Sequence, residues 1–191
     1  MPLLSDLLDG TTAPSELASD SLELMEAWNA NGGSRLDLDL NGKIDDPGAA
    51  VMDRAWPKIA NAFMEPQLGP QLDELASLFS RFDLPPSGQY SGWHQYFDRD
   101  VRDLLGQTVE QPFENDFCGG DDLSDCQDDV WAAIQAAATE LETDQGADPT
   151  AWRSDAVRER ISFTGISLTT MRYTNRPSGI QQVISFDGHR P

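Results

Sequence analysis

An aspartate-rich run separates two apolar segments of the chain, and its composition limits the structure that this run can adopt. Residues 36–48 read LDLDLNGKIDDPG, in which Asp37, Asp39 and Asn41 alternate and Gly42 follows. Alternating oxygen side chains followed by glycine make the front half of a calcium-binding loop, because the glycine takes the sharp turn that aims the oxygens inward. The run therefore predicts a loop with a cluster of carboxylates.

Two interpretations of this loop stay open. In the first it binds Ca2+ as a cofactor, and the predicted ligands are Asp37, Asp39, Asn41, Lys43 and Asp45. The twelfth position, where a bidentate Glu would complete the shell, is Gly48. A substitute would come from Asp45, Asp46, Asp53 or water. In the second interpretation the run is a solvated turn, in which Asp and Asn side chains accept backbone hydrogen bonds and Gly42 supplies the positive φ.

The charge of the chain excludes two classes of partner. It has 33 acidic and 13 basic residues, a formal net charge of −20. A chain this acidic repels phosphate backbones and anionic lipid surfaces, so we expect no nucleic-acid and no membrane partner. The opening MPLLSDLLDG has neither a basic start nor a long apolar stretch, so we expect no secretion signal and no membrane span in this chain.

Apolar residues at helical spacing predict a mostly helical chain. The predicted helices cover residues 15–28, 52–63, 70–84, 93–106, 123–146 and a short turn at 148–152. Pro57 lies inside the second pattern, so we expect that helix to kink or to start afresh near Trp56. The stripe of Trp, Met and Phe in it is interpreted as core.

The two cysteines, Cys118 and Cys126, lie in the glycine- and aspartate-rich segment FCGGDDLSDC. We expect a local disulfide, which would stabilise the fold by roughly 2 to 3 kcal/mol and would imply an oxidising compartment. The alternative is two unpaired thiols. A zinc site is the poorer interpretation, because two cysteines without a nearby His supply half of a ligand set.

The end of the chain changes character. Residues 161–173 and 179–186 are rich in β-branched and aromatic side chains, and Asn, Pro, Ser and Gly separate them. They predict two strands, so the fold class is α+β, mostly helical with a C-terminal β-hairpin. An isolated hairpin leaves its edges unpaired, so we expect these strands to join a sheet supplied from elsewhere.

No motif nominates a catalytic centre. Glycine-rich nucleotide signatures and the GxSxG elbow are absent, and only His94 and His189 are histidines. His94 lies in an aromatic cluster and is interpreted as a packed side chain. The acids at 121–129 lie in the N-terminal half of a predicted helix, where they suit the helix dipole.

Three segments point to one known family. The first runs from Trp28 through the aspartate-rich run to AAVMDRAW, the second is the CGG…DC loop leading into VWAAI, and the third is the closing MRYTNRPSGIQQVISF. Together they resemble the C-terminal part of the β subunit of the penicillin acylase family, and N-R-P-S-G-x-x-Q is the most specific piece. The resemblance covers residues 1–191 as one region, which would be the distal part of an Ntn-hydrolase β subunit.

The resemblance implies a hydrolase that cleaves the amide bond of N-acylated compounds, such as β-lactam side chains in antibiotic metabolism, acyl homoserine lactones or acylated lipopeptides. In that family an exported precursor cuts itself and exposes an N-terminal Ser, whose α-amine activates its own hydroxyl, and an oxyanion hole includes a downstream Asn. The complete protein would therefore be extracellular or periplasmic. Calcium at residues 37–45 is not implied by the resemblance and rests on spacing alone.

Met1 and Pro2 cannot serve as that nucleophile, so we assign no catalytic residue in this chain. We expect the nucleophile and oxyanion Asn to lie upstream, and the isolated chain to be inactive. Its partner would be the remaining portion of a penicillin acylase-like enzyme, which would take a small N-acylated substrate. The alternative functions are a stand-alone acidic calcium-binding or interaction module, or an inactive remnant.

Overall fold

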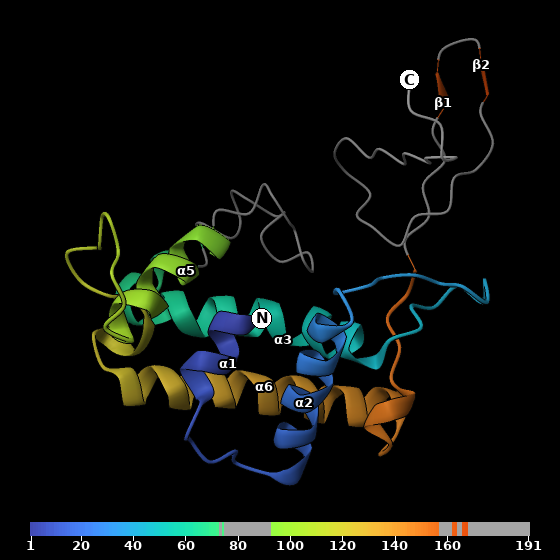
Figure 1. The fold of residues 1–191 in the computed structure, drawn as a ribbon, viewed down its shortest axis with the longest axis horizontal. Helices are drawn as coiled ribbons and strands as arrows, with labels where there is room; N and C mark the ends of the chain where they lie inside the picture. Colours follow the sequence, from blue (N-terminus) through green and yellow to red (C-terminus); the bar gives the residue numbers. More distant parts are fainter. Residues whose placement is uncertain (73, 75–92, 157–161, 164–165, 168–191) are drawn as a thin grey trace, which may run out of the picture.

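The structure is a computed structural model that describes residues 1–72, 74, 93–156, 162–163 and 166–167 (Figure 1). The helices with bounds in these ranges are α1 (Pro2–Leu8), α2 (Glu16–Ala30), α3 (Pro47–Leu68), α5 (Trp93–Leu104) and α6 (Leu123–Gln145), with two short 3-10 turns, η2 (Cys118–Gly120) and η3 (Pro149–Ala151). The mostly helical prediction is confirmed. Most of the predicted helix at 70–84 lies outside the described residues.

Local capping explains where the predicted helices begin and end. The Ser15 hydroxyl accepts the N–H of Ala18 at 3.1 Å and starts α2, one residue from the predicted position. The carboxylate of Asp122 accepts two backbone N–H groups of the first turn of α6. Gly146 ends α6 with φ at +98°, a backbone conformation that favours glycine.

Helix α3 begins earlier than the apolar pattern predicts and runs through Pro57. Its first residue is Pro47, which suits a first turn, and the Asp46 carboxylate caps it by accepting the N–H of Gly48 at 2.9 Å. Of the two alternatives predicted at Pro57, a fresh start near Trp56 is wrong, because α3 is one helix through this position. Because both sides of Pro57 carry buried residues, burial of the continuous apolar face outweighs the one helix hydrogen bond that proline removes.

Helix α1 was not predicted. Its four leucines, at positions 3, 4, 7 and 8, recur at helical spacing, and each is at most 9% exposed. Pro2 at the first helical turn is compatible with this start. A helix this short is marginal alone, so packing of its leucine face against the body stabilises it.

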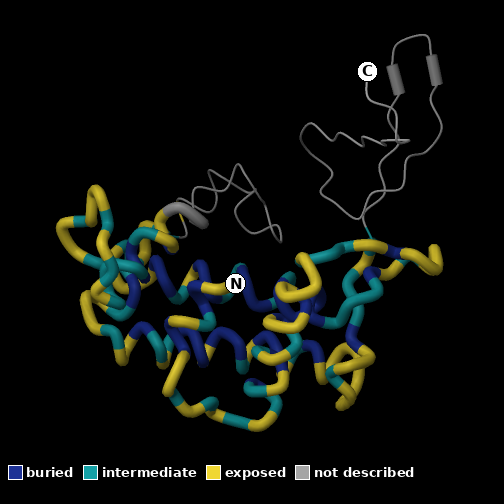
Figure 2. The backbone as a smooth tube through the Cα atoms, in the orientation of Figure 1, coloured by how far each residue is buried: buried dark blue, intermediate teal, exposed yellow. Residues whose placement is uncertain are grey.

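The helical body is organised around α3 and α6, which lie side by side along its length and make its most extensive contact (Figure 1). Buried residues line the facing sides of these two helices, as the dark segments of Figure 2 show. The predicted stripe on α3 forms part of this core, with Ile59 fully buried and Phe63 1% exposed. Helix α2 packs against both α3 and α6, and α5 contacts α1 and α3.

The predicted disulfide is present. Cys118 and Cys126 are bonded, both are fully buried, and the bond joins the η2 turn to the first turns of α6. It therefore fixes the N-terminal end of α6 to the segment that arrives from α5.

The described residues do not reach the predicted hairpin as a whole. They include two dipeptide strands, β1 (Ser162–Phe163) and β2 (Ile166–Ser167), which pair antiparallel with Ser162 opposite Ser167. Both fall within the first predicted strand, while the second strand and the turn at 175–179 lie outside the described residues. Among the helices that the structure describes, none combines the length and the apolar character needed to cross a bilayer.

Candidate metal centre

The aspartate-rich loop is pinned to a distant part of the chain. The N–H of Ile44 donates to the carbonyl of Ser154 at 2.8 Å, and the N–H of Ala156 donates to the carbonyl of Gly42 at 2.8 Å. Ile44 itself is fully buried. The loop therefore has a fixed frame on its C-terminal side, which local sequence spacing did not reveal.

Three of the predicted ligands converge in this frame. Oxygen atoms of Asp37, Asp39 and Asp45 all lie within 4.8 Å of one another. Asp37 is 9% exposed, so this carboxylate lies at the inner side of the loop. The oxygens of these three aspartates therefore lie close together, and their role as metal ligands stays a prediction.

Each of the three carboxylates also accepts a backbone hydrogen bond from the loop. Asp37 accepts the N–H of Gly42 at 3.1 Å, Asp39 accepts that of Asn41 at 3.1 Å, and Asp45 accepts that of Leu38 at 3.0 Å. Gly42 has φ at +91°. The solvated-turn interpretation predicts these features, and carboxylates held in this way are also the hard oxygen donors that Ca2+ prefers.

The other two predicted ligands make contacts of their own. The side-chain oxygen of Asn41 accepts the N–H of Lys43 at 2.7 Å, and its amide nitrogen donates to Asp39 at 2.8 Å. The ammonium of Lys43 donates at 2.5 Å to the carboxylate of Asp155, a residue of the segment to which the loop is pinned.

The structure explains why the twelfth position of the calcium pattern is glycine. A Cβ on Gly48 would lie 2.2 Å from the backbone carbonyl oxygen of Leu24, so no side chain fits there. Of the three proposed substitutes, Asp46 caps α3. Asp53 accepts hydrogen bonds from both terminal nitrogens of the Arg35 guanidinium, each at 2.7 Å. Asp45 is the substitute that joins the cluster.

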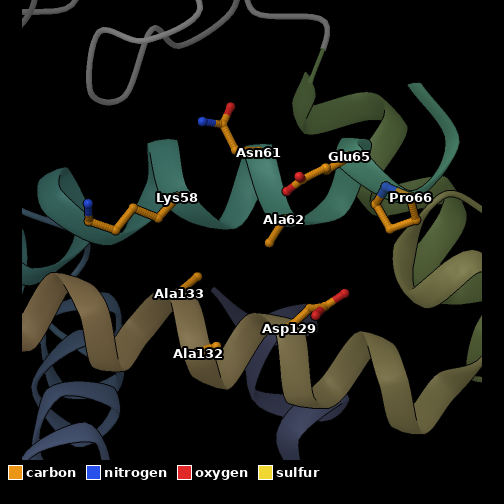
Figure 3. Close-up of a pocket in the computed structure, with 8 residues that line it drawn as sticks. All are labelled: Lys58, Asn61, Ala62, Glu65, Pro66, Asp129, Ala132 and Ala133. Carbon is orange, nitrogen blue, oxygen red and sulfur yellow. The ribbon is translucent and has the colours of Figure 1, made fainter. Parts of the chain in front are cut away.

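A second feature is a groove of about 480 Å³ between α3 and α6 (Figure 3). Glu65 of α3 and Asp129 of α6 line this groove together with short alanine side chains, and Figure 3 shows that Asn61 points away from α6. Burial, followed by the charges of Asp125, Glu65 and Asp128, raises the pKa of Asp129. Lys58 lies at the other end and donates to Glu140 at 2.6 Å.

A third feature is a buried carboxylate beside the disulfide. Asp100 on α5 is fully buried and accepts the N–H groups of Phe117 at 2.7 Å and Cys118 at 3.0 Å. Burial raises the pKa of Asp100, although these two hydrogen bonds act in the opposite direction. The role of this residue was not predictable from the sequence, because its partners are 17 and 18 positions away.

The described residues do not assemble a nucleophile with a base. Both cysteines are in the disulfide, and several hydroxyls, including those of Ser21, Thr139 and Thr143, donate to the carbonyl of the preceding helical turn. The side chains of His94 and His189 lie outside the residues described.

Comparison with known proteins settles the family. The model of the penicillin amidase family matches residues 1–179, which is nearly the whole chain. No curated protein matches the chain. The match includes the aspartate-rich loop, the disulfide and all the described helices. The chain therefore belongs to the penicillin amidase family.

Proposed function

We propose that this chain is the helical, distal region of an amidohydrolase that cleaves N-acyl amides, and that its nucleophile is supplied by another portion of the enzyme. The observation that carries the proposal is the family match over residues 1–179. The family is one of acylase-like hydrolases. The substrate class, an N-acylated small molecule of the β-lactam, acyl homoserine lactone or lipopeptide type, is part of the proposal.

The geometry of the described residues favours a structural role for this region over a catalytic one. Its polar side chains mostly cap helices, bridge helices or hold loops, as Ser15, Asp122 and Asp100 do. Ntn-type chemistry needs a hydroxyl activated by an amine and an oxyanion hole, whereas the hydroxyls of Ser21, Thr139 and Ser15 are engaged in helical hydrogen bonds or with an amide side chain. The partner is accordingly the remaining portion of the enzyme.

The test compares the isolated chain with the complete gene product that contains it. Both are incubated with a panel of N-acyl nitroanilides carrying phenylacetyl, octanoyl and dodecanoyl groups, and release of nitroaniline is followed. We expect turnover by the complete product and none by the isolated chain. Turnover by the isolated chain would refute the absent nucleophile, and failure of both across the panel would refute the amidase assignment.

We also propose that the aspartate-rich loop binds Ca2+, as a second function. The supporting observation is the convergence of three carboxylates within 4.8 Å. Hard oxygens in such a cluster suit Ca2+, although the blocked twelfth position reduces the number of protein ligands and leaves room for water. An ion there would offset the repulsion between Asp37, Asp39 and Asp45.

Calorimetry with Ca2+ decides this proposal. The chain is titrated beside Asp39→Ala and beside Asp20→Asn, which removes the same charge from an exposed position on α2. We expect binding that Asp39→Ala abolishes and Asp20→Asn retains. No heat in the unchanged chain, or equal binding in both variants, would exclude the site and leave the solvated turn.

A further inference from the structure

The segment between α5 and α6 is anchored to the helical body by favourable contacts, but it also places several acidic side chains near one another. Its residues 107–122 are named the disulfide segment here. Apolar contacts hold it, since the ring of Phe117 stacks on Phe63 of α3 at 5.9 Å and meets Phe113 edge-on at 5.2 Å. The buried carboxylate of Asp100 holds it as well, through the N–H groups of Phe117 and Cys118.

Asp116 is the anomaly in this segment. Its Oδ1 atom is buried and meets no hydrogen-bond donor among the residues that the structure describes. Its backbone is well engaged, because its N–H donates to the carboxylate of Asp121 and its carbonyl accepts from Gln67 of α3 at 3.0 Å. The side chain is therefore held in place while one of its oxygens lacks a donor.

We propose that the disulfide segment is a pH-dependent latch, closed when the Asp116 carboxyl carries a proton and loosened when that proton leaves. A protonated carboxyl is neutral and puts no second negative charge beside the buried Asp100. A carboxylate in the same place repels its acidic neighbours and holds an unsatisfied buried oxygen. The latch does not depend on the proposed amidase function.

The charged groups around Asp116 are acidic on the sides that the structure describes. Asp100 and Asp103 of α5 and Asp121 after η2 all act to raise its pKa, and burial is the largest cause. Together they bring the pKa of Asp116 to about 6. The contact from α3 comes from Gln67, which is uncharged.

The arginines of α5, Arg99 and Arg102, have other partners. Arg99 lies over the ring of Phe113, 5.0 Å from its centre, and Arg102 donates to Asp98 at 3.1 Å. The sign of the effect follows from linkage: a carboxyl whose pKa is raised in the closed state binds its proton more tightly there than in the open state. Closure is therefore favoured at low pH and is lost as the pH rises from about 4 to about 6.

Reduction of the disulfide reports on the latch, because both cysteines are fully buried while it is closed. The full chain is treated with a phosphine reductant between pH 4.5 and 7.5, and a disulfide-bonded peptide of residues 115–128 gives the intrinsic rate at each pH. A pKa of about 6 for Asp116 would change closure at most about a hundredfold, and partial exposure of the side chain reduces this to about tenfold. We expect the normalised reduction rate to rise about tenfold across this range.

Two variants decide whether Asp116 is responsible. Asp116→Asn keeps the shape without the titration, so its rate at pH 7.5 is expected to match the slow rate of the unchanged chain at pH 4.5. Glu114→Gln removes one charge from an exposed position in the same segment and is expected to keep the tenfold rise. Circular dichroism confirms that each variant keeps its helices. A flat profile in the unchanged chain, or a rise retained in Asp116→Asn, would overturn the proposal.

Discussion

Replacing Gly48 with alanine tests the closest approach between α2 and α3. The new Cβ would lie 2.2 Å from the carbonyl oxygen of Leu24 and 2.5 Å from the Cβ of Trp28. Both atoms are backbone or next to it, so neither swings aside, and the helices have to separate. Overpacking of this kind costs about 1 to 3 kcal/mol, while alanine regains less than about 1 kcal/mol of helix propensity. We expect the free energy of unfolding to fall by about 2 kcal/mol.

Urea unfolding followed by tryptophan fluorescence measures this loss, because Trp28 and Trp56 are buried in the body. The control is Gly10→Ala, where φ is +71° and no atom lies within 4 Å, so only the backbone strain of about 1 kcal/mol is expected. Gly48→Glu, which restores the twelfth residue of the calcium pattern, should unfold the chain rather than strengthen Ca2+ binding. Unchanged stability in Gly48→Ala would refute the close packing described here.

Three other perturbations follow from the same packing. Replacing both Cys118 and Cys126 with serine should lower the free energy of unfolding by about 2 to 3 kcal/mol, and equal urea midpoints for oxidised and reduced chain would contradict this. Asp100→Ala leaves two buried N–H groups without an acceptor and should cost about 3 kcal/mol, measured the same way, whereas a loss below about 1 kcal/mol would show that water replaces the carboxylate. Glu140→Gln should cost less than about 1 kcal/mol at pH 7, because the bridge to Lys58 is partly exposed. The hydrogen bond to Lys58 lowers the pKa of Glu140, so the difference should vanish as the pH falls through that pKa, and a difference that persists in acid would refute the ionic origin.

The features that could be predicted well from the sequence depend on residues that are close together along the chain. Ser15 and Gly146 mark helix ends because a cap depends on a few neighbouring residues, and the structure places both at such ends. The acids at 121–129 were assigned to the helix dipole, and the structure shows that one of them, Asp122, is the N-terminal cap of α6. The disulfide was predictable for the same reason, since its two cysteines are separated by a short glycine-rich segment. The convergence of Asp37 and Asp39 likewise follows from alternation within one loop.

What sequence missed depends on contacts between distant residues. Asp100 looks like one more surface acid on α5, and nothing near it indicates that it accepts two N–H groups beyond the end of that helix. The role of Gly48 is set by α2, which lies in a different segment. Helix α1 has a visible leucine pattern, but seven residues with an early proline give little periodicity to detect.

The pairing of Gly42 and Ile44 with residues 154–156 also determines when the aspartate-rich loop can fold during synthesis of the chain. Lys43 meets a residue 112 positions further on, so these partners leave the ribosome long after the aspartate-rich loop does. Helices α2 and α3 have already emerged by then, while the loop between them still lacks its hydrogen bonds to residues 154–156. Its acidic side chains therefore take their final arrangement late, and a nascent chain halted before residue 154 should carry formed helices around an unfinished turn.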